Sequence, residues 1–305
     1  MISIIVPCKN EAAALPLFYP VFKENIVKLN EDYELIIVDD GSTDDTVLEA
    51  MKLKETDARI KVISFSRNFG KEAAMLAGLR EAKGDYVAIM DADLQDPPSL
   101  LGKLYGYVAT GEYDSAATYR VDRKGEPPIR SFFARNFYRL INKMIDVEIV
   151  DGARDYRLMN RKMVDAIISL PEYNRFSKGI FAWVGFKTKY VEFENVERVA
   201  GETKWSFWKL FAYAIDGIVG FTIAPLRIAT YSGAFVSLFG FLYMLYIVMK
   251  ALLIGDPVAG YPSLIAIICL LGGIQLLVMG IMGEYLGKTY LESKRRPSYV
   301  IKEIK

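Results

Sequence analysis

The chain has 305 residues, of which 52% are hydrophobic, and its 38 Lys and Arg residues nearly balance its 37 Asp and Glu residues. A net charge of +1 argues against a nucleic-acid-binding protein, because such proteins carry an excess of basic side chains. Histidine is absent, which excludes His-ligated zinc, Ser-His-Asp triads and imidazole general bases. Any metal ion would therefore be a hard cation held by oxygen atoms.

Apolar and helix-like segments alternate over the first 120 residues. Residues 2–6, 35–38, 60–65 and 86–90 are the predicted strands, and residues 12–29, 44–54 and 71–83 are the predicted helices between them. The N-terminus lacks the basic and long apolar regions of a signal peptide, so residues 2–6 are expected to be a buried strand. Short apolar strands separated by helices are typical of a parallel sheet that is covered on both faces. Ligands of such sheets bind beyond the carboxyl ends of the strands.

The pattern is less regular between residues 120 and 200. Residues 120–143 are rich in arginine and aromatic side chains, and one further strand is predicted at residues 186–193. Residues 205–225 contain Trp, Phe and Tyr with few charges, which favours a helix in the membrane interface. A helix packed on the soluble domain is the alternative.

Two long segments without charged side chains follow, at residues 228–249 and 257–283. Each is long enough to cross the apolar core of a bilayer, which takes about 20 residues. Basic residues flank the pair at Arg227 and at 288–296, whereas the connector holds only Lys250 and Asp256. The positive-inside rule then predicts that both termini and the first 200 residues are cytoplasmic.

Three polar clusters follow predicted strands. Asp91 and Asp93 come directly after residues 86–90, and two carboxylates in this spacing can share a divalent cation and a diphosphate. A turn that caps the next helix is the alternative reading.

The second cluster, at residues 39–44, places acids where a ribose or base is commonly contacted. Helix N-capping by Ser42, Thr43 or Asp44 is the alternative, and both roles can hold together. The third cluster, at residues 7–11, can close over the same nucleotide.

Four further segments complete a pattern: residues 66–74 (SRNFGKEAA), 90–98 (MDADLQDPP), 152–159 (GARDYRLM) and 201–206 (GETKWS). With the two apolar segments, they resemble family 2 glycosyltransferases of the GT-A fold. More narrowly, they resemble the bacterial polyprenyl-phosphate glycosyltransferases related to dolichol-phosphate mannose synthase. The resemblance covers essentially the whole chain.

The resemblance implies an α/β architecture with four parts. A cytoplasmic, Rossmann-like GT-A domain with a mostly parallel sheet is expected over residues 1–200, followed by interfacial helices at 201–226. Two transmembrane helices are expected within 227–286 and a basic cytoplasmic tail at 287–305. The same resemblance implies a bacterial inner-membrane protein and a homo-oligomer, with a tetramer as the expected form.

It also assigns roles to individual residues. Asp91, Asp93 and Gln95 are expected to hold Mg²⁺ or Mn²⁺ against the donor diphosphate. The nucleotide would be bound by Pro7, Asn10, Glu11, Asp39, Asp40 and Asp91. Asp155 matches the position usually proposed as the base and acts with Asp93 in catalysis. The acceptor phosphate is assigned to Arg120, Arg123, Arg130, Arg135 and Lys204, where the spacing departs from the dolichol-phosphate enzymes. A solvated basic face is the alternative for these arginines.

The implied reaction is inverting transfer of a hexose from a nucleotide diphosphate sugar to a polyprenyl phosphate lipid. UDP-glucose is the expected donor and UDP-N-acetylglucosamine the alternative. A phosphate monoester is mostly dianionic near pH 7, because its second pKa is roughly 6. We therefore expect Asp155, which lies between Arg154 and Arg157, to position neighbouring groups and to act only weakly as a base.

Two other functions are weighed against this one. A processive polysaccharide synthase would carry a QxxRW motif, but Gln95 and Gln275 are the only glutamines and neither precedes Arg-Trp. A membrane-anchored nucleotide-sugar sensor would keep the nucleotide-binding strand ends but would not need Asp155 or the arginines.

Overall fold

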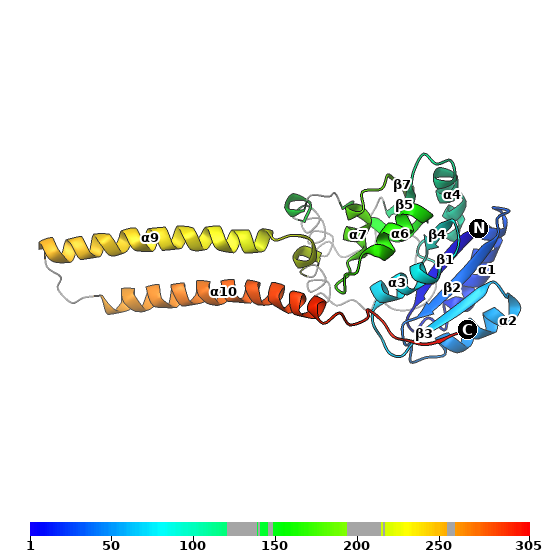
Figure 1. Ribbon diagram of the computed structural model, residues 1–305, viewed down its shortest axis with the longest axis horizontal. Helices are drawn as coiled ribbons and strands as arrows, with labels where there is room; N and C mark the ends of the chain where they lie inside the picture. The colour runs from blue at the N-terminus through cyan, green and yellow to red at the C-terminus, as the bar shows by residue number, and fades with distance from the viewer. Residues whose placement is uncertain (121–138, 140, 146–148, 194–214, 216, 255–259) are drawn as a thin grey trace. The chain divides into compact units, whose positions relative to one another are not determined.

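The computed structural model describes the whole chain except residues 121–138, 140, 146–148, 194–214, 216 and 255–259. The described residues form two units (Figure 1). The first comprises Met1–Gly217 together with Arg296–Lys305, and the second comprises Ile218–Arg295.

An eight-stranded sheet organises the first unit, with the strand order β7-β5-β6-β4-β1-β2-β3-β8. The strands are β1 (Ile2–Cys8), β2 (Tyr33–Asp39), β3 (Ile60–Phe65), β4 (Tyr86–Ile89), β5 (Ser115–Arg120), β6 (Ala153–Asn160), β7 (Thr188–Phe193) and β8 (Ile301–Ile304). Strands β4, β1, β2 and β3 are parallel neighbours, as the alternating sequence pattern predicts. Strand β6 pairs antiparallel with β4 and β5, and β7 pairs parallel with β5.

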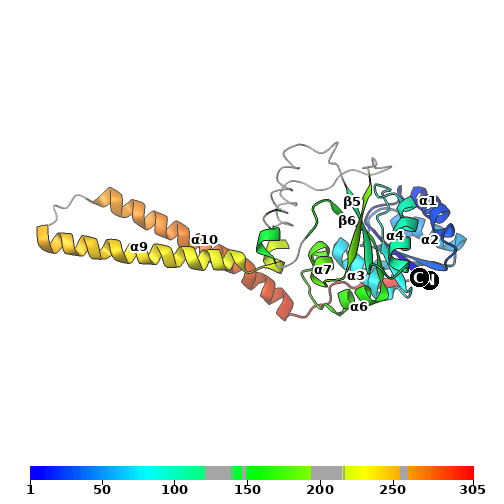
Figure 2. The same cartoon turned by 90° about the horizontal axis from the view of Figure 1, so that it is seen from above.

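Helices cover both faces of this sheet (Figure 2). They are α1 (Leu15–Val27), α2 (Thr46–Thr56), α3 (Lys71–Glu81), α4 (Leu101–Ala109), α6 (Arg161–Ser169) and α7 (Ser177–Trp183), and the short 3-10 helix η1 (Pro98–Leu100) precedes α4. Helices α1, α2 and α4 lie on one face, and α3, α6 and α7 lie on the other. The prediction of a doubly covered sheet is confirmed.

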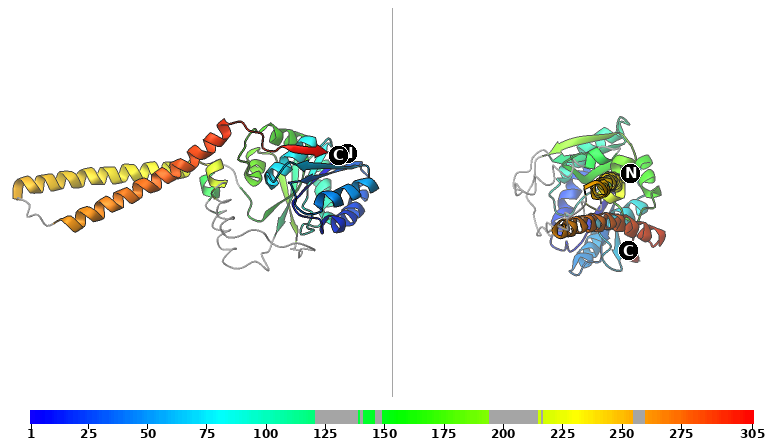
Figure 3. Two further views of the ribbon diagram at one scale, coloured as in Figure 1. Left: turned by 90° about the horizontal axis from the view of Figure 1, so that it is seen from below. Right: turned by 90° about the vertical axis from the view of Figure 1, so that its left-hand side faces the viewer.

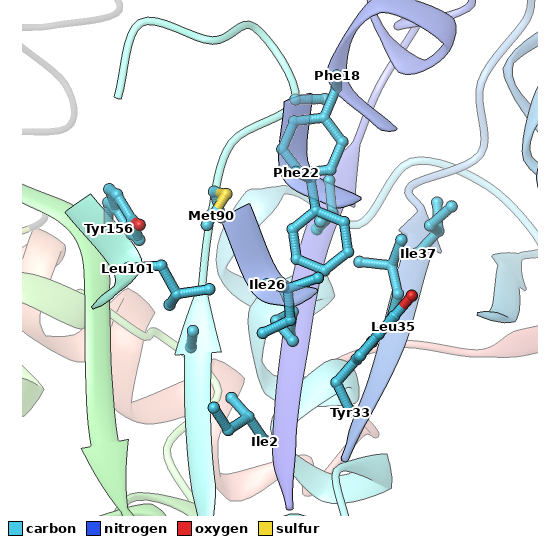
Figure 4. Packing of buried hydrophobic residues seen from close by; sticks show 14 of the residues in the cluster. Ile2, Phe18, Phe22, Ile26, Tyr33, Leu35, Ile37, Met90, Leu101 and Tyr156 are labelled. Carbon is cyan, nitrogen blue, oxygen red and sulfur yellow. The ribbon is translucent and has the colours of Figure 1, made fainter. Parts of the chain in front are cut away.

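The core on the α1 face is built from the side chains that α1 turns toward β1 and β2 (Figure 4). Phe18 and Phe22 stack with their ring centroids 5.7 Å apart, and Phe22 meets Tyr33 edge-on at 5.7 Å. All three are buried, together with Ile26 and Leu35. Burying each large apolar side chain contributes about 1.5–3 kcal/mol. This layer therefore fixes the positions of the first two strands, whose ends form part of the site.

The opposite face depends on small side chains. Helix α3 buries Ala73, Ala74, Ala77 and Gly78, and a Cβ on Gly78 would lie 2.2 Å from Cγ2 of Ile5. Alanine and glycine here let the α3 backbone come directly against β1. The first residue of α3 is consequently held close to the edge of the sheet.

A buried carboxylate, Asp57, connects α1, β2 and the loop after α2. It accepts hydrogen bonds from the hydroxyls of Tyr19 and Tyr33 at 2.8 Å each, and from Nε of Arg59 at 2.8 Å. Lys23 forms an ion pair with the same carboxylate. Burial raises the pKa of Asp57, but the bonds from Arg59, Lys23 and Tyr33 outweigh it and hold the pKa below its ordinary value.

Asp57→Asn should therefore destabilise the protein by about 2–3 kcal/mol, because it leaves two cations without their partner. Such a change lowers the thermal midpoint by about 5–10 °C in a domain of this size. Because the folded-state pKa is depressed, the penalty is full above the ordinary value of 3.8 and shrinks as the pH falls below it. Thermal melts of the detergent-solubilised protein would measure this, with exposed Asp32→Asn as the control. A penalty that grows on acidification would contradict the assignment.

The edge strand β8 was not predicted, since residues 287–305 were expected to form a basic tail. The Val62 amide donates to the carbonyl of Lys305 at 2.8 Å, and the Lys305 amide donates to the carbonyl of Val62 at 2.8 Å. Just before β8, Tyr299 stacks on Phe65 with ring centroids 5.1 Å apart. Residues 296–305 thus belong to the sheet unit.

The second unit contains the helices α9 (Ala224–Ile254) and α10 (Tyr261–Ser293), which form an antiparallel hairpin (Figure 3). The hydroxyl of Tyr285 donates to the carbonyl of Thr222 at 2.6 Å. The segments Ala224–Ile247 and Leu270–Ser293 are long and apolar enough to cross a membrane, and almost none of their side chains are buried within the protein. Such exposed apolar surface requires an apolar surrounding. Helix α10 continues past the predicted end of the apolar segment at residue 283. The predicted interfacial helix at 205–225 lies mostly outside the described residues.

Candidate active site

The loops that follow β1 and β2 are joined by hydrogen bonds at the carboxyl edge of the sheet. The Asn10 amide donates to Oγ of Ser42 at 2.8 Å, and the Thr43 amide donates to Oδ1 of Asn10 at 2.8 Å. The Glu11 amide donates to Oγ1 of Thr46 at 2.8 Å. Because these bonds turn the chain, α1 begins at Leu15, three residues after its predicted start. Pro7 lies within β1, so the predicted nucleotide-binding residues of this segment all lie at one edge.

The two acids that end and follow β2 are buried and hold the surrounding loops. Asp39 accepts from the Ser42 amide at 3.0 Å and from the Ser64 hydroxyl at 3.1 Å. Asp40 accepts from the amides of Phe69 at 2.6 Å and Gly70 at 3.0 Å, at the start of α3. Burial raises the pKa of Asp40, and these backbone amides oppose the rise. The Asp40 carboxylate therefore shapes the loop at residues 66–70, and its predicted contact with a nucleotide stays a prediction.

The N-capping alternative for this cluster was wrong in detail. Helix α2 begins at Thr46, so Asp45 occupies the cap position and makes no side-chain capping bond. Asp44 instead accepts from the Thr46 amide at 3.1 Å. Gly41 has a φ of +61°, and a Cβ there would lie 2.5 Å from the carbonyl carbon of Arg67. A glycine is required at this position because the loop at 66–70 rests directly on it.

The cluster after β4 presents carboxylates to the same edge. Asp93 accepts from the Gln95 amide at 3.1 Å, and Asp91 forms an ion pair with Nζ of Lys71 at 2.8 Å. Leu94, between Asp93 and Gln95, has a φ of +57°, a backbone conformation that costs a residue with a side chain about 1–2 kcal/mol. Its side chain packs against the hydrophobic core, which holds the turn in this strained form. Strain of this kind is concentrated at functional sites.

These residues fit a divalent cation. The described part of the chain contains no group of three or more Asp, Glu or Cys residues that would enclose a metal ion by themselves. Mg²⁺ sites that also bind phosphates commonly use only one or two carboxylates. The ammonium group of Lys71 lies against Asp91, which shows that this position attracts positive charge. Asp91, Asp93 and Gln95 carry side-chain oxygen atoms, the type of donor that such a cation prefers.

Strand β6 contributes the remaining charged groups, divided between its two faces. Asp155 accepts from Nζ of Lys71 at 2.7 Å, whereas Arg154, on the opposite face, pairs with the buried Asp96 at 3.0 Å. Arg154 is therefore not a side-chain neighbour of Asp155 despite its place in the sequence, because neighbouring side chains of a strand point to opposite faces. Burial raises the pKa of Asp96 to about 6 against the opposing charge of Arg154.

Arg157, two residues beyond Asp155 on the same face, is only 3% exposed. Its guanidinium carbon lies 3.5 Å from the ring centroid of Phe181 in α7. Burial lowers the pKa of Arg157 to about 10, while Tyr190 and Asp155 act against the shift. Desolvation by burial raises the pKa of Asp155, but the charges of Lys71 and Lys178 outweigh it and keep the pKa below its ordinary value. Asp155 is therefore a stable carboxylate, which suits a positioning role better than that of a base.

Arg120 is the one predicted acceptor-phosphate residue within the described residues. It ends β5, and its amide donates to the carbonyl of Gly152 at 3.1 Å, directly before β6. Arg123, Arg130, Arg135 and Lys204 lie outside the described residues.

The sequence reasoning missed Lys71 and the pair formed by Asp96 and Arg154. Lys71 follows Gly70 in the segment after the third parallel strand, where no carboxylate pair marks a site in the sequence. Glu72, beside it, accepts from the Ser177 amide at 3.1 Å and so ties α3 to α7.

Comparison with known proteins places the chain in a family. Residues 3–168 match the family model described as glycosyl transferase family 2, and residues 224–289 match the model described as the GtrB C-terminal hairpin. The chain is 45% identical to the putative glycosyltransferase CsbB of Bacillus subtilis (strain 168), over 99% of this chain and 92% of that protein. It is 41% identical to the prophage bactoprenol glucosyl transferase homolog of Escherichia coli (strain K12), over 100% of this chain and 99% of that protein.

Among solved structures, the chain is similar to the mannosyltransferase PcManGT from Pyrobaculum calidifontis in complex with GDP-Man and Mn²⁺. The TM-score is 0.50 at 17% identity, over 95% of this chain and 86% of that chain, and this likeness concerns the fold. The match to the family 2 model, the hairpin match and the full-length relatives agree with the GT-A fold. The chain belongs to glycosyl transferase family 2 and is a glycosyltransferase.

Proposed function

We propose that this enzyme transfers glucose from UDP-glucose to a polyprenyl phosphate at the cytoplasmic face of the bacterial inner membrane. One observation carries the proposal: the chain matches, over its full length and including the apolar hairpin, relatives named bactoprenol glucosyl transferase. A lipid acceptor requires the active site to work beside a membrane, and α9 and α10 provide two helices that can anchor it there. The basic residues that flank these helices support cytoplasmic termini. A homotetramer is proposed by resemblance alone.

The reaction exchanges one bond at the anomeric carbon for another. The bond to the donor diphosphate breaks as a phosphate oxygen of the lipid forms a bond on the opposite face of the sugar, so the configuration inverts. Asp91, Asp93 and Gln95 would hold Mg²⁺ or Mn²⁺, which stabilises the negative charge of the departing UDP.

The remaining residues bind and orient the two substrates. Asn10, Glu11 and Asp39 lie at the strand ends where the nucleotide would bind. Arg120, at the end of β5, is proposed for the acceptor phosphate because a guanidinium matches phosphate oxygens in pairs. Asp155 holds Lys71 beside the reacting groups.

The proposal is tested by incubating the purified enzyme in detergent with labelled UDP-glucose, undecaprenyl phosphate and Mn²⁺. Label should appear in the organic-extractable lipid, and EDTA should abolish it. Label from UDP-N-acetylglucosamine but not from UDP-glucose would keep the reaction and correct the sugar. If no nucleotide sugar is transferred although UDP binds, the proposal is overturned in favour of a nucleotide-sugar sensor.

A further inference from the structure

Lys71 joins two carboxylates that come from neighbouring strands. Its Nζ lies 2.8 Å from Oδ1 of Asp91, which follows β4, and 2.7 Å from Oδ2 of Asp155 in β6. Without this ammonium group between them, the two carboxylates would repel each other at close range. The Lys71 side chain is 41% exposed, so a solute can reach it.

The position of Lys71 is fixed by the surrounding backbone. Gly70 precedes it with a φ of +98°, and the amides of Phe69 and Gly70 are held by Asp40. Helix α3 begins at Lys71 and lies tightly on β1 through Gly78. These contacts hold the ammonium group of Lys71 at the carboxyl edge of the parallel strands, beside Asp91 and Asp155.

Helix stability does not account for a lysine at this position. The first turn of a helix favours negative side chains, because the free amides there carry partial positive charge. A lysine as the first residue is unfavourable to α3 by itself, whereas Glu72 beside it has the favoured sign. The ion pairs with Asp91 and Asp155 stabilise the charged side chain of Lys71 at this position, whereas the helix itself does not.

We propose that Lys71 is a placeholder cation: its ammonium group pairs with Asp91 in the free enzyme, and the divalent metal ion displaces it from Asp91 when the donor binds. This inference rests on the proposed function, in which Asp91 is a metal ligand. Lys71 keeps its bond to Asp155 after the exchange and so holds that carboxylate in position. Because the ammonium group opposes a bare metal ion, the metal binds well only together with the negatively charged nucleotide diphosphate.

The exchange predicts an effect on metal binding that is separate from catalysis. In Lys71→Met, Mn²⁺ should bind the nucleotide-free enzyme about tenfold more tightly than in the wild type, because a competing positive charge is gone. Lys71→Arg, which keeps the charge, should stay near the wild-type affinity. Turnover of Lys71→Met should nevertheless fall, because Asp155 loses its partner.

The measurement is titration of the full-length detergent-solubilised enzyme with Mn²⁺, followed by the electron paramagnetic resonance signal of the free ion, with and without UDP. Lys61→Met is the matched control, because Lys61 is a partly exposed lysine paired with Glu81 at the far end of α3. It should change neither Mn²⁺ affinity nor turnover.

Equal or weaker Mn²⁺ binding by Lys71→Met, with normal binding by the wild type, would overturn the placeholder role and leave the proposed function standing. The same affinity gain in Lys61→Met would also overturn it, since the effect would then be a general one of charge. Failure of the wild type to bind Mn²⁺ even with UDP would overturn both the metal assignment and this inference.

Discussion

Replacing Asp93 with asparagine is expected to lower glucosyl transfer by about 10³-fold, which corresponds to about 4 kcal/mol of transition-state stabilisation. In the proposed site, the charge of this carboxylate would hold the metal ion against the departing diphosphate. Asparagine has nearly the same size, and its amide oxygen can still accept the bond from the Gln95 amide. The turn that carries Leu94 should therefore survive, and the loss should be chemical.

Turnover and Mn²⁺ affinity should be measured on the same preparation, with thermal melts to verify the fold. Asp85→Asn is the matched control, because Asp85 lies just before β4 whereas Asp93 lies beyond its other end, and its side chain is 79% exposed. The control should behave as the wild type. An Asp93→Asn enzyme that keeps more than about a tenth of wild-type turnover would contradict the metal assignment, since removing one such group costs at least about 100-fold.

Asp155→Asn is expected to reduce turnover by about 100-fold, and to a similar extent at every pH between about 6 and 9. Burial raises the pKa of Asp155, but Lys71 and Lys178 outweigh it, so the carboxylate stays ionised throughout this range. Above about pH 7 the acceptor phosphate has already lost most of its second proton, so little remains for a base to remove, whereas near pH 6 about half of the phosphate still carries that proton. The loss then reflects Lys71 and its neighbours moving out of place.

The pH dependence of kcat/KM for the wild type and the variant separates positioning from base catalysis. A base would matter most at the acidic end, where the phosphate still keeps its proton, so a loss concentrated there would refute the positioning role. Asp165→Asn, an exposed carboxylate in α6 paired with Arg161, is the control and should leave the profile unchanged.

The parallel part of the fold could be predicted because each of its strands is recognisable from a short stretch of consecutive residues. Each of β1 to β4 is a short apolar segment, and the parallel arrangement brings Asp39 and Asp91 to one edge without any knowledge of side-chain contacts. The position of β6 between β4 and β5 could not be predicted, because antiparallel insertion of a later strand depends on pairing far along the chain.

The contact between Lys71 and Asp155 was missed for the same reason. The two residues are 84 positions apart in sequence, and only the placement of β6 beside β4 brings them together. The sequence predicts a nucleotide contact for Asp40, which stays a prediction, but it gives no sign of the partners found in the structure, the amides 29 and 30 residues later. A polar residue at a strand end looks the same in sequence whether it contacts a ligand or supports the loop that does.

The edge strand β8 has a consequence for how the protein is made. It follows both apolar helices in the chain, so the ribosome produces the partner of β3 only after the whole hairpin has been synthesised. Domains begin to fold from their N-terminal parts during synthesis. Until β8 arrives, one edge of β3 presents unpaired amides and carbonyls, which readily pair with another chain. Pairing of β8 with β3 is therefore the last step in forming the sheet. We expect chains that stall before this step to aggregate through the unpaired edge of β3.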